Sequence, residues 1–165
     1  MAVAVAICPG SFDPITIGHV DIVGRASKMF DKVIMLTMVN RKKVSLFTPE
    51  ERVDFMRRAT AKFPNVEVDF FDGLLADYAK EKGAIAIVKG LRALSDFDDE
   101  FKQALANKKI APGVETIFLV TSAEHMFLSS SVVKEIGSFG GDIGGFVPPE
   151  IKEDIIKLIR ERCTQ

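Results

Sequence analysis

Residues 8–19 read CPGSFDPITIGH and directly follow the apolar run 2–7. An apolar run that ends at a proline and a glycine is typical of a strand buried on both faces. The first helix is predicted to begin around Gly18, so His19 would lie at a helix N-terminus just after a strand. Backbone N–H groups and the helix dipole favour an anion there, and an imidazole Nε2 can donate to an oxygen whose charge grows during a reaction. This stretch therefore predicts a phosphate site, although a lone histidine at such a position also serves as a helix cap.

Strand and helix patterns alternate along the chain. Apolar runs of strand length occupy residues 2–7, 33–39, 66–71, 84–88 and 116–121. Patterns with helical periodicity occupy residues 20–30, 53–63, 74–81, 97–109, 130–136 and 150–162. The second helix has a readable start, because Thr48 and Glu51 form a T-x-x-E capping box with Pro49 in the first turn. The alternation predicts an α/β, Rossmann-like fold, which is a doubly wound, five-stranded parallel sheet with strand order 3-2-1-4-5.

The composition fits one globular domain, which we expect to span residues 1–165. The chain is 47% hydrophobic, and 22 Lys and Arg against 23 Asp and Glu leave a net charge of -1. A charge so near zero argues against nucleic acid or a membrane surface as a partner. No apolar run approaches the roughly 18 residues of a membrane span. Cys8 and Cys163 match no zinc or redox spacing, so we expect a cytoplasmic location.

The phosphate motifs of the commonest nucleotide enzymes are missing from the sequence. Neither G-x-G-x-x-G nor G-x-x-x-x-G-K-[ST] follows the first predicted strand, which argues against dinucleotide oxidoreductases and P-loop kinases. The segment 138–145 carries four glycines, but it follows no predicted strand. We therefore interpret it as the connection between the last two helices.

Two further motifs follow later strands. Residues 89–92 read KGLR and are predicted to lie just beyond the strand 84–88. They offer two cations, and the glycine between them lets the backbone approach a ligand closely. Residues 128–131 read LSSS after the strand 116–121, and hydroxyls and free amides at a helix start can hold phosphate oxygens. Three serines alone are more often just a cap. Because the first and fourth strands are neighbours at the switch point, the motifs are expected to face one crevice.

The T-I-G-H at residues 16–19 resembles the (H/T)-x-G-H signature of the nucleotidyltransferase superfamily. Within it, the chain resembles the bacterial phosphopantetheine adenylyltransferase family over nearly its whole length. The matching stretches are PGSFDPITxGH at 9–19, DIVxRA at 21–26, FTxEERV at 47–53, GLRAxxDF at 90–97, SSSVVKE at 129–135 and GDI at 141–143. The resemblance implies an enzyme of coenzyme A biosynthesis that transfers AMP from ATP to 4'-phosphopantetheine, giving dephospho-coenzyme A and pyrophosphate.

The resemblance also implies roles for single residues. His19 would be catalytic by stabilising the transition state. Positions implied to bind ATP are Ser11, Phe12, His19, Gly90, Leu91, Arg92, Glu100, His125, Met126, Phe127, Leu128, Ser129, Ser130 and Ser131. Positions implied to bind phosphopantetheine are Ser11, Lys43, Leu75 and Lys89. Four residues depart from the family pattern. Lys89 replaces a common arginine, Cys8 and His125 replace frequent aromatic residues, and Ser11 replaces a more frequent threonine and keeps its hydroxyl.

The implied chemistry needs no protein nucleophile. A phosphate monoester is already anionic near neutral pH, so we assign no general base. No residue is implied as a metal ligand, and Mg²⁺ is expected on ATP, held mostly by phosphate oxygens and water. The resemblance further implies a homohexamer and feedback inhibition by coenzyme A.

Two other functions stay open. Another small adenylyl- or cytidylyltransferase would act on a substrate such as nicotinamide mononucleotide or glycerol 3-phosphate. A nucleotide-binding regulatory module without catalysis would need only affinity, and the presence of His19, Lys43 and Arg92 together argues against it.

Overall fold

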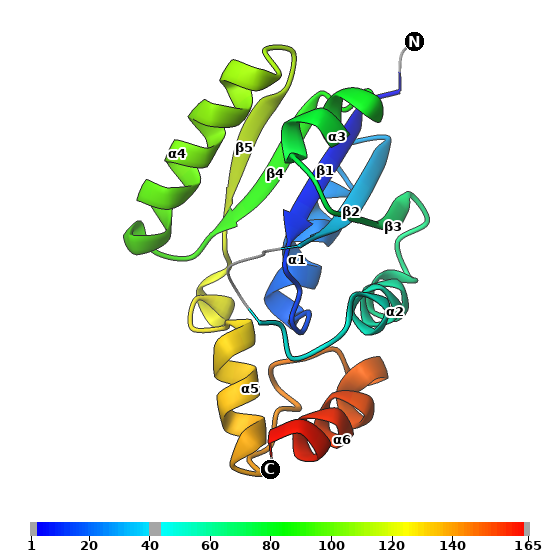
Figure 1. The fold of residues 1–165 in the computed structure, drawn as a ribbon, viewed down its shortest axis with the longest axis vertical. Coiled ribbons are helices and arrows are strands. Elements are labelled where there is room, and N and C mark those ends of the chain that lie inside the picture. Colours follow the sequence, from blue (N-terminus) through cyan, green and yellow to red (C-terminus); the bar gives the residue numbers. More distant parts are fainter. Residues whose placement is uncertain (1–2, 40–43, 164–165) are drawn as a thin grey trace.

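The computed structural model describes residues 3–39 and 44–163, which build a parallel sheet with helices on both faces (Figure 1). The strands are β1 (Val5–Gly10), β2 (Lys32–Met38), β3 (Val66–Phe71), β4 (Ala86–Leu91) and β5 (Glu115–Val120). They lie in the order β3-β2-β1-β4-β5, and each neighbouring pair is parallel. The predicted α/β, Rossmann-like fold and its strand order are confirmed.

Helices follow the strands in sequence. They are α1 (Ile17–Ala26), α2 (Pro49–Thr60), α3 (Leu75–Glu81), α4 (Leu94–Ile110), α5 (Ser130–Ser138) and α6 (Lys152–Cys163), with short 3₁₀ turns at Ala123–His125 and Pro149–Ile151. The predicted capping box opens α2, where Thr48 N donates to Glu51 Oε2 at 2.8 Å and Glu51 N donates to Thr48 Oγ1 at 3.3 Å. Figure 1 shows α5 and α6 together beyond the carboxyl ends of the strands.

The central strands β1 and β2 and the first half of β4 are buried on both faces, whereas the edge strands β3 and β5 are partly exposed. Along β1, Ala6 and Cys8 belong to a core cluster shared with α1, α2, α5 and α6. Val5 and Ile7 belong to a second cluster, which includes α3. Two-sided burial explains why the central strands read as continuous apolar runs rather than alternating patterns.

The first strand begins and ends later than the predicted run 2–7. Pro9 lies within β1 and pairs in register with Leu36 of β2. The ladder between β1 and β4 covers only Ala6 and Ile7, so the missing N–H of Pro9 removes no bond from that ladder. A proline is tolerated here for this reason, and it does not end the strand as the sequence pattern indicated.

The fourth strand also runs further than predicted. The prediction 84–88 ended it before the KGLR stretch, but Lys89, Gly90 and Leu91 pair with β5 and belong to β4. Glycine normally weakens a strand, and for this reason the prediction ended the strand before Gly90. Here it allows close packing of α1, since a Cβ on Gly90 would lie 3.0 Å from Ile22 Cγ1. The expectation that the whole stretch lies beyond the strand was therefore wrong.

Three helices have ends that the periodicity misplaced. The patterns 20–30 and 53–63 outlast α1 and α2, because Phe30 and Phe63 pack against the same core from the turns that follow these helices. In the third case, α4 begins at residue 94 rather than 97, so Asp96 lies in its first turn, where the helix dipole favours an acidic side chain. The remaining helix and strand ends agree with the prediction within two residues.

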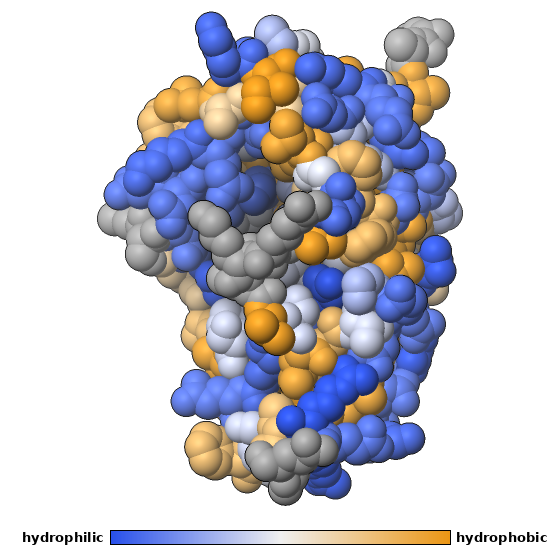
Figure 2. All heavy atoms as spheres, in the orientation of Figure 1, coloured by the Kyte–Doolittle hydropathy of each residue, from blue (hydrophilic) through white to orange (hydrophobic). Residues whose placement is uncertain are grey.

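Polar and apolar residues are mixed over the face drawn in Figure 2. Among residues 3–39 and 44–163, no helix combines the length and the apolar character needed to cross a membrane.

Candidate active site

His19 is held at the start of α1 by Thr16, the N-cap residue. Thr16 donates its backbone N–H to His19 Nδ1 at 3.0 Å, and Thr16 Oγ1 lies 3.0 Å from the same nitrogen. The backbone N–H of His19 in turn donates to Thr16 Oγ1 at 3.4 Å. Because Nδ1 accepts a backbone N–H, the proton of the neutral ring resides on Nε2. His19 is thus part of the helix cap and also a hydrogen-bond donor.

The surroundings of His19 keep its ring neutral. Burial and the positive charge of Arg92 lower the pKa of His19 from 6.5 to about 4. At physiological pH the ring therefore presents an Nε2–H group without a positive charge. Such a donor, fixed in advance, suits an oxygen that becomes more negative during a reaction.

Phe12 packs edge-on against His19, with ring centroids 5.1 Å apart. Its side chain is buried, and its backbone φ of 46° lies in the left-handed region that bulky residues seldom adopt. The ring also covers Gly10, where a Cβ would lie 2.8 Å from Phe12 Cζ. The ring of this predicted ATP-binding residue is therefore in the core, where it helps to fix the orientation of His19.

Both cations of the KGLR stretch are paired with carboxylates of α4. Lys89 Nζ lies 2.7 Å from Glu100 Oε2, and both side chains are largely buried. Arg92 donates from Nε and Nη2 to the two carboxylate oxygens of Asp96, at 3.1 and 3.4 Å. Asp96 and Glu100 are four residues apart, so they lie on one side of the helix. The helix thus presents two anions to the two cations at the end of β4.

The segment before α5 contacts both of the other motifs. Arg92 Nη1 donates to Leu128 O at 2.7 Å. A Cβ on Gly18 would lie 3.5 Å from His125 Cβ and 3.7 Å from Leu128 Cδ1. Three motifs that are far apart in the sequence therefore meet at the carboxyl ends of β1, β4 and β5, as the strand order predicts.

Two of the three serine hydroxyls at α5 are engaged within the protein. Ser129 is the N-cap, and its Oγ accepts the N–H of Val132 at 3.1 Å. Ser130 Oγ donates to Pro14 O at 2.7 Å. Ser131 is exposed. The N–H of Val133 also donates, to Ser129 O. The groups available to an anion here are therefore the backbone N–H groups of Ser130 and Ser131 and the Ser131 hydroxyl.

The other predicted site residues lie further from this centre. Leu75 is the first residue of α3 and packs against the second core cluster. Met126 and Phe127 are exposed in the turn before α5. Lys43 lies outside the described residues, so its position relative to the site is not part of the structure.

Three charged residues near the site were not singled out from the sequence. Arg52 is 3% exposed and donates from Nη1 to Ser11 O at 2.8 Å, which fixes the backbone of the loop after β1. Asp13 is 5% exposed and lies 2.7 Å from Lys134 Nζ. Arg52, Asp13 and Lys134 all lie in stretches that carry the family resemblance. Their presence as charged residues within those stretches is the signal that could have identified them from the sequence.

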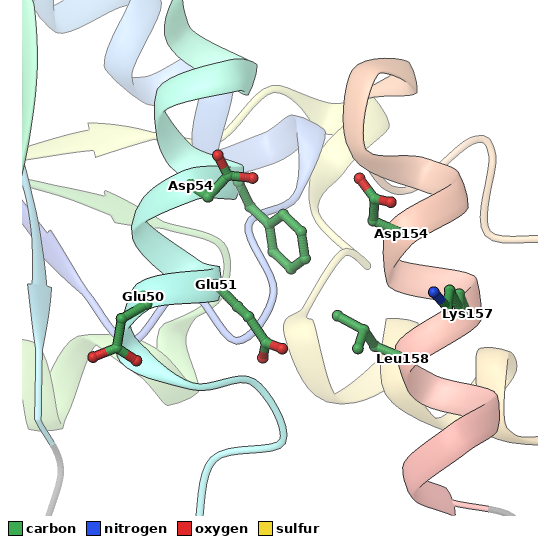
Figure 3. A pocket seen from close by; sticks show the side chains of 7 residues that line it. Glu50, Glu51, Asp54, Asp154, Lys157 and Leu158 are labelled. Carbon is green, nitrogen blue, oxygen red and sulfur yellow. The ribbon is translucent and has the colours of Figure 1, made fainter.

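A hollow of about 360 Å³ lies elsewhere, between α2 and α6 (Figure 3). Its lining consists of Glu50, Glu51, Asp54, Phe55, Asp154, Lys157 and Leu158. None of these residues belongs to the three motifs. We therefore base the candidate site on the converging motifs rather than on this hollow.

Sequence relatives cover nearly the whole chain. Residues 7–136 match the cytidylyltransferase-like family. The phosphopantetheine adenylyltransferase of Caldanaerobacter subterraneus subsp. tengcongensis is 52% identical over 157 residues, which make up 95% of this chain and 98% of that protein. The phosphopantetheine adenylyltransferase of Clostridium tetani is 53% identical over 153 residues, or 93% of this chain and 96% of that protein.

Solved structures of more distant proteins share the fold. The nicotinic acid mononucleotide adenylyltransferase of Plasmodium falciparum superimposes with a TM-score of 0.70 at 16% identity, over 94% of this chain and 96% of that one. A bifunctional NMN adenylyltransferase/ADP ribose pyrophosphatase from Francisella tularensis gives a TM-score of 0.73 at 14% identity, over 99% of this chain and 53% of that one. These likenesses concern the fold, whereas identity above one half over almost the full length of both proteins concerns the family. By that measure the chain belongs to the phosphopantetheine adenylyltransferase family, within the cytidylyltransferase-like proteins.

Proposed function

We propose that the protein is a single nucleotidyltransferase domain, spanning residues 1–165, that transfers AMP from ATP to 4'-phosphopantetheine. The products are dephospho-coenzyme A and pyrophosphate, which makes the reaction a step of coenzyme A biosynthesis. The observation that carries this proposal is the neutral Nε2–H donor of His19, fixed by Thr16 and lying where three motifs of the family meet. The names of relatives with 52% and 53% identity support the choice of substrates.

The reaction is an in-line displacement at the α-phosphorus of ATP. An oxygen of the phosphopantetheine phosphate forms the new P–O bond while the bond to pyrophosphate breaks. The attacking phosphate is already anionic, so the protein supplies orientation and charge stabilisation instead of a base. In this proposal His19 donates from Nε2 to the oxygens of the transferring phosphorus, where negative charge develops.

The remaining site residues bind the two substrates in the proposal. Lys43, Lys89, Leu75 and Ser11 bind phosphopantetheine. Arg92 and the N-terminus of α5 bind the ATP phosphates, and the segment 125–128 lies on the adenine side. Because Arg92 already bonds to Asp96 and to Leu128, its guanidinium is oriented before any nucleotide arrives.

Mg²⁺ accompanies ATP in this proposal. Among residues 3–39 and 44–163, no group of three or more His, Cys, Asp or Glu side chains is arranged to hold a metal ion. The carboxylate of Asp13 already accepts two backbone N–H groups and pairs with Lys134. We therefore expect phosphate oxygens and water to hold the Mg²⁺ ion, which would offset part of the charge of the triphosphate.

We also propose a cytoplasmic homohexamer that coenzyme A inhibits. An exposed apolar row on α4 supports self-association, and it consists of Phe97, Phe101 and Leu105, each four residues from the next. Light scattering of the purified protein gives the number of subunits. A titration with coenzyme A at fixed substrate concentrations tests the inhibition.

One assay tests the proposed reaction. Pyrophosphate release should require both ATP and 4'-phosphopantetheine, and it should stop when EDTA removes Mg²⁺. Nicotinamide mononucleotide and glycerol 3-phosphate serve as competing acceptors and should give no release. Pyrophosphate formed with either of these acceptors, and not with 4'-phosphopantetheine, would assign the protein to another transferase of the same fold.

A further inference from the structure

Asp13 joins three segments through one buried carboxylate. Its Oδ1 accepts the N–H of Phe47 at 2.9 Å, and its Oδ2 accepts the N–H of Leu46 at 3.1 Å. The same Oδ2 lies 2.7 Å from Lys134 Nζ. The loop after β1, the segment before α2 and helix α5 therefore meet at one side chain. Lys134 supplies the positive charge that a buried carboxylate needs.

Helix α5 contacts the loop at two consecutive residues. Lys134 binds Asp13, and Ser130 donates to the carbonyl of Pro14 at 2.7 Å. The two helix residues are four apart, so they lie on the same side of α5. The contacted residues stand two and three positions before Thr16, the N-cap whose backbone holds His19. This pair of contacts sets the position of the α5 N-terminus relative to the start of α1.

We propose that Lys134 is a positioning residue for adenylyl transfer: by binding Asp13, it keeps the N–H groups at the start of α5 in register with His19. The inference rests on the proposed function, because the register matters only if both groups act on the same triphosphate. Lys134 touches neither substrate in this role. It acts through the carboxylate of Asp13.

A direct contact between Lys134 and a phosphate is the competing role. Its side chain is 28% exposed, whereas that of Asp13 is 7% exposed. Moving Nζ to a ligand would break the ion pair with the buried Asp13 carboxylate and leave it only the Coulombic attraction of Arg52 and Arg162, at a cost that a phosphate contact must first overcome. The two roles also predict different results when both residues are replaced.

The test measures kcat and both KM values of Lys134→Met. Displacing a catalytic group by about 1 Å costs on the order of 100-fold in rate, so kcat should fall by about that factor. The KM for 4'-phosphopantetheine should stay within about threefold of the wild type, since its binding groups are untouched, and the KM for ATP should rise by much less than kcat falls. Lys134→Arg keeps the ion pair and should recover most of the lost kcat. Lys152→Met is the matched control, because Lys152 pairs with Asp142 at 3.0 Å and is 31% exposed, and its kcat should not change.

A double-mutant cycle separates positioning from direct contact. Asp13→Asn should also lower kcat, and the double variant Asp13→Asn/Lys134→Met should be no slower than the slower single variant. If the two losses multiply instead, Lys134 acts on the substrate and the inference is wrong. An unchanged kcat in Lys134→Met also contradicts it.

Two controls keep these outcomes distinct. Thermal unfolding of each variant reports whether it folds, and Lys134→Gln replaces Lys134→Met if the latter does not. With Lys134→Gln we expect a smaller loss of kcat at a constant KM for 4'-phosphopantetheine, and an unchanged kcat would overturn the inference. If the wild type releases no pyrophosphate from ATP and 4'-phosphopantetheine, the proposed function itself is wrong. If the wild type is active and Lys134→Met is equally active, only the positioning role of Lys134 is wrong.

Discussion

Lys89 Nζ and Glu100 Oε2 lie 2.7 Å apart, so the cation near the end of β4 already has an anionic partner. The carboxylate oxygen accepts no hydrogen bond among the described residues, and the ammonium charge is what compensates its burial. A phosphate that approaches Lys89 therefore competes with Glu100 or shares the lysine with it.

Lys89→Ala should raise the KM for 4'-phosphopantetheine far more than the KM for ATP. A charge-assisted hydrogen bond is worth roughly 1.5 to 3 kcal/mol, which corresponds to about 10- to 150-fold in affinity. Each substrate is titrated at saturating levels of the other. An increase confined to the KM for ATP would show that Lys89 binds the nucleotide instead.

The pairing with Glu100 requires a second variant. Lys89→Ala alone leaves the Glu100 carboxylate buried without a cation, which costs stability whatever the lysine binds. The double variant Lys89→Ala/Glu100→Gln removes this charge. It should unfold near the wild-type temperature and still show the raised KM for 4'-phosphopantetheine.

His19→Ala should lower kcat by about 100- to 1000-fold, as the loss of one preorganised donor typically does. Binding of ATP should change much less, because the hydrogen bond strengthens only as charge develops. Steady-state kinetics together with calorimetric titration of ATP separate the two effects. A variant with nearly wild-type kcat would reduce His19 to its capping role at Thr16.

The pKa of His19 also predicts a pH dependence of stability. Burial and Arg92 lower it from 6.5 to about 4, so between these pH values the unfolded chain binds a proton that the folded chain does not. The free energy of unfolding contributed by this group is therefore lost as the pH falls from 6.5 to 4, at about 1.4 kcal/mol per pH unit. Urea unfolding of the wild type and of His19→Ala across this range should converge at low pH by that slope. Parallel curves would contradict the lowered pKa.

Arg162→Lys should weaken the attachment of α6. Arg162 bonds to both carboxylate oxygens of Glu51 at 2.7 Å and to Leu46 O at 2.8 Å, a geometry that lysine cannot reproduce. We expect a loss of about 1 kcal/mol in the free energy of unfolding at neutral pH. Lys157→Ala is the control. Lys157 is exposed and its Nζ is as far as 4.0 Å from Glu161 Oε1, so this substitution should not measurably change the free energy of unfolding.

Acid should remove the effect of Arg162→Lys. Hydrogen bonds from Arg162 lower the pKa of the Glu51 carboxyl, so this group stabilises the fold above its unfolded pKa. That stabilisation is lost as the pH falls through the lower, folded-state pKa. Unfolding curves of the wild type and the variant should therefore differ at pH 7 and coincide at pH 2. A difference that persists at pH 2 would assign the effect to the bond with Leu46 O or to packing of the arginine side chain.

The sequence predicted the sheet because its signals are local. Continuous apolar runs and the capping box of Thr48 and Glu51 reflect burial and hydrogen bonding of neighbouring residues. Strand ends were misjudged where a neighbouring strand decides the outcome. Pro9 stays in β1 because the β4 ladder is short, and Gly90 stays in β4 because β5 continues beside it.

The convergence of the three motifs was predictable from the sequence, and the hydrogen bonds between them were less so. The strand order alone brings His19, Arg92 and Leu128 together. That Ser130 donates to Pro14 and that Lys134 neutralises Asp13 depends on how α5 is oriented against the loop. Such contacts join residues more than a hundred positions apart, and no spacing within the sequence encodes them.

Positions 10 and 12 have consequences for anyone who engineers this chain. The Phe12 ring is buried over Gly10, and a Cβ at position 10 would lie 2.8 Å from Phe12 Cζ, so the ring would have to shift within the core. A library that varies one position at a time therefore tests larger residues at position 10 against this ring. Combinations with a smaller residue at position 12 relieve the clash, and they remove the ring that packs edge-on against His19. Positions 10 and 12 should therefore be varied together, because each choice there affects both the local packing and the orientation of the His19 ring.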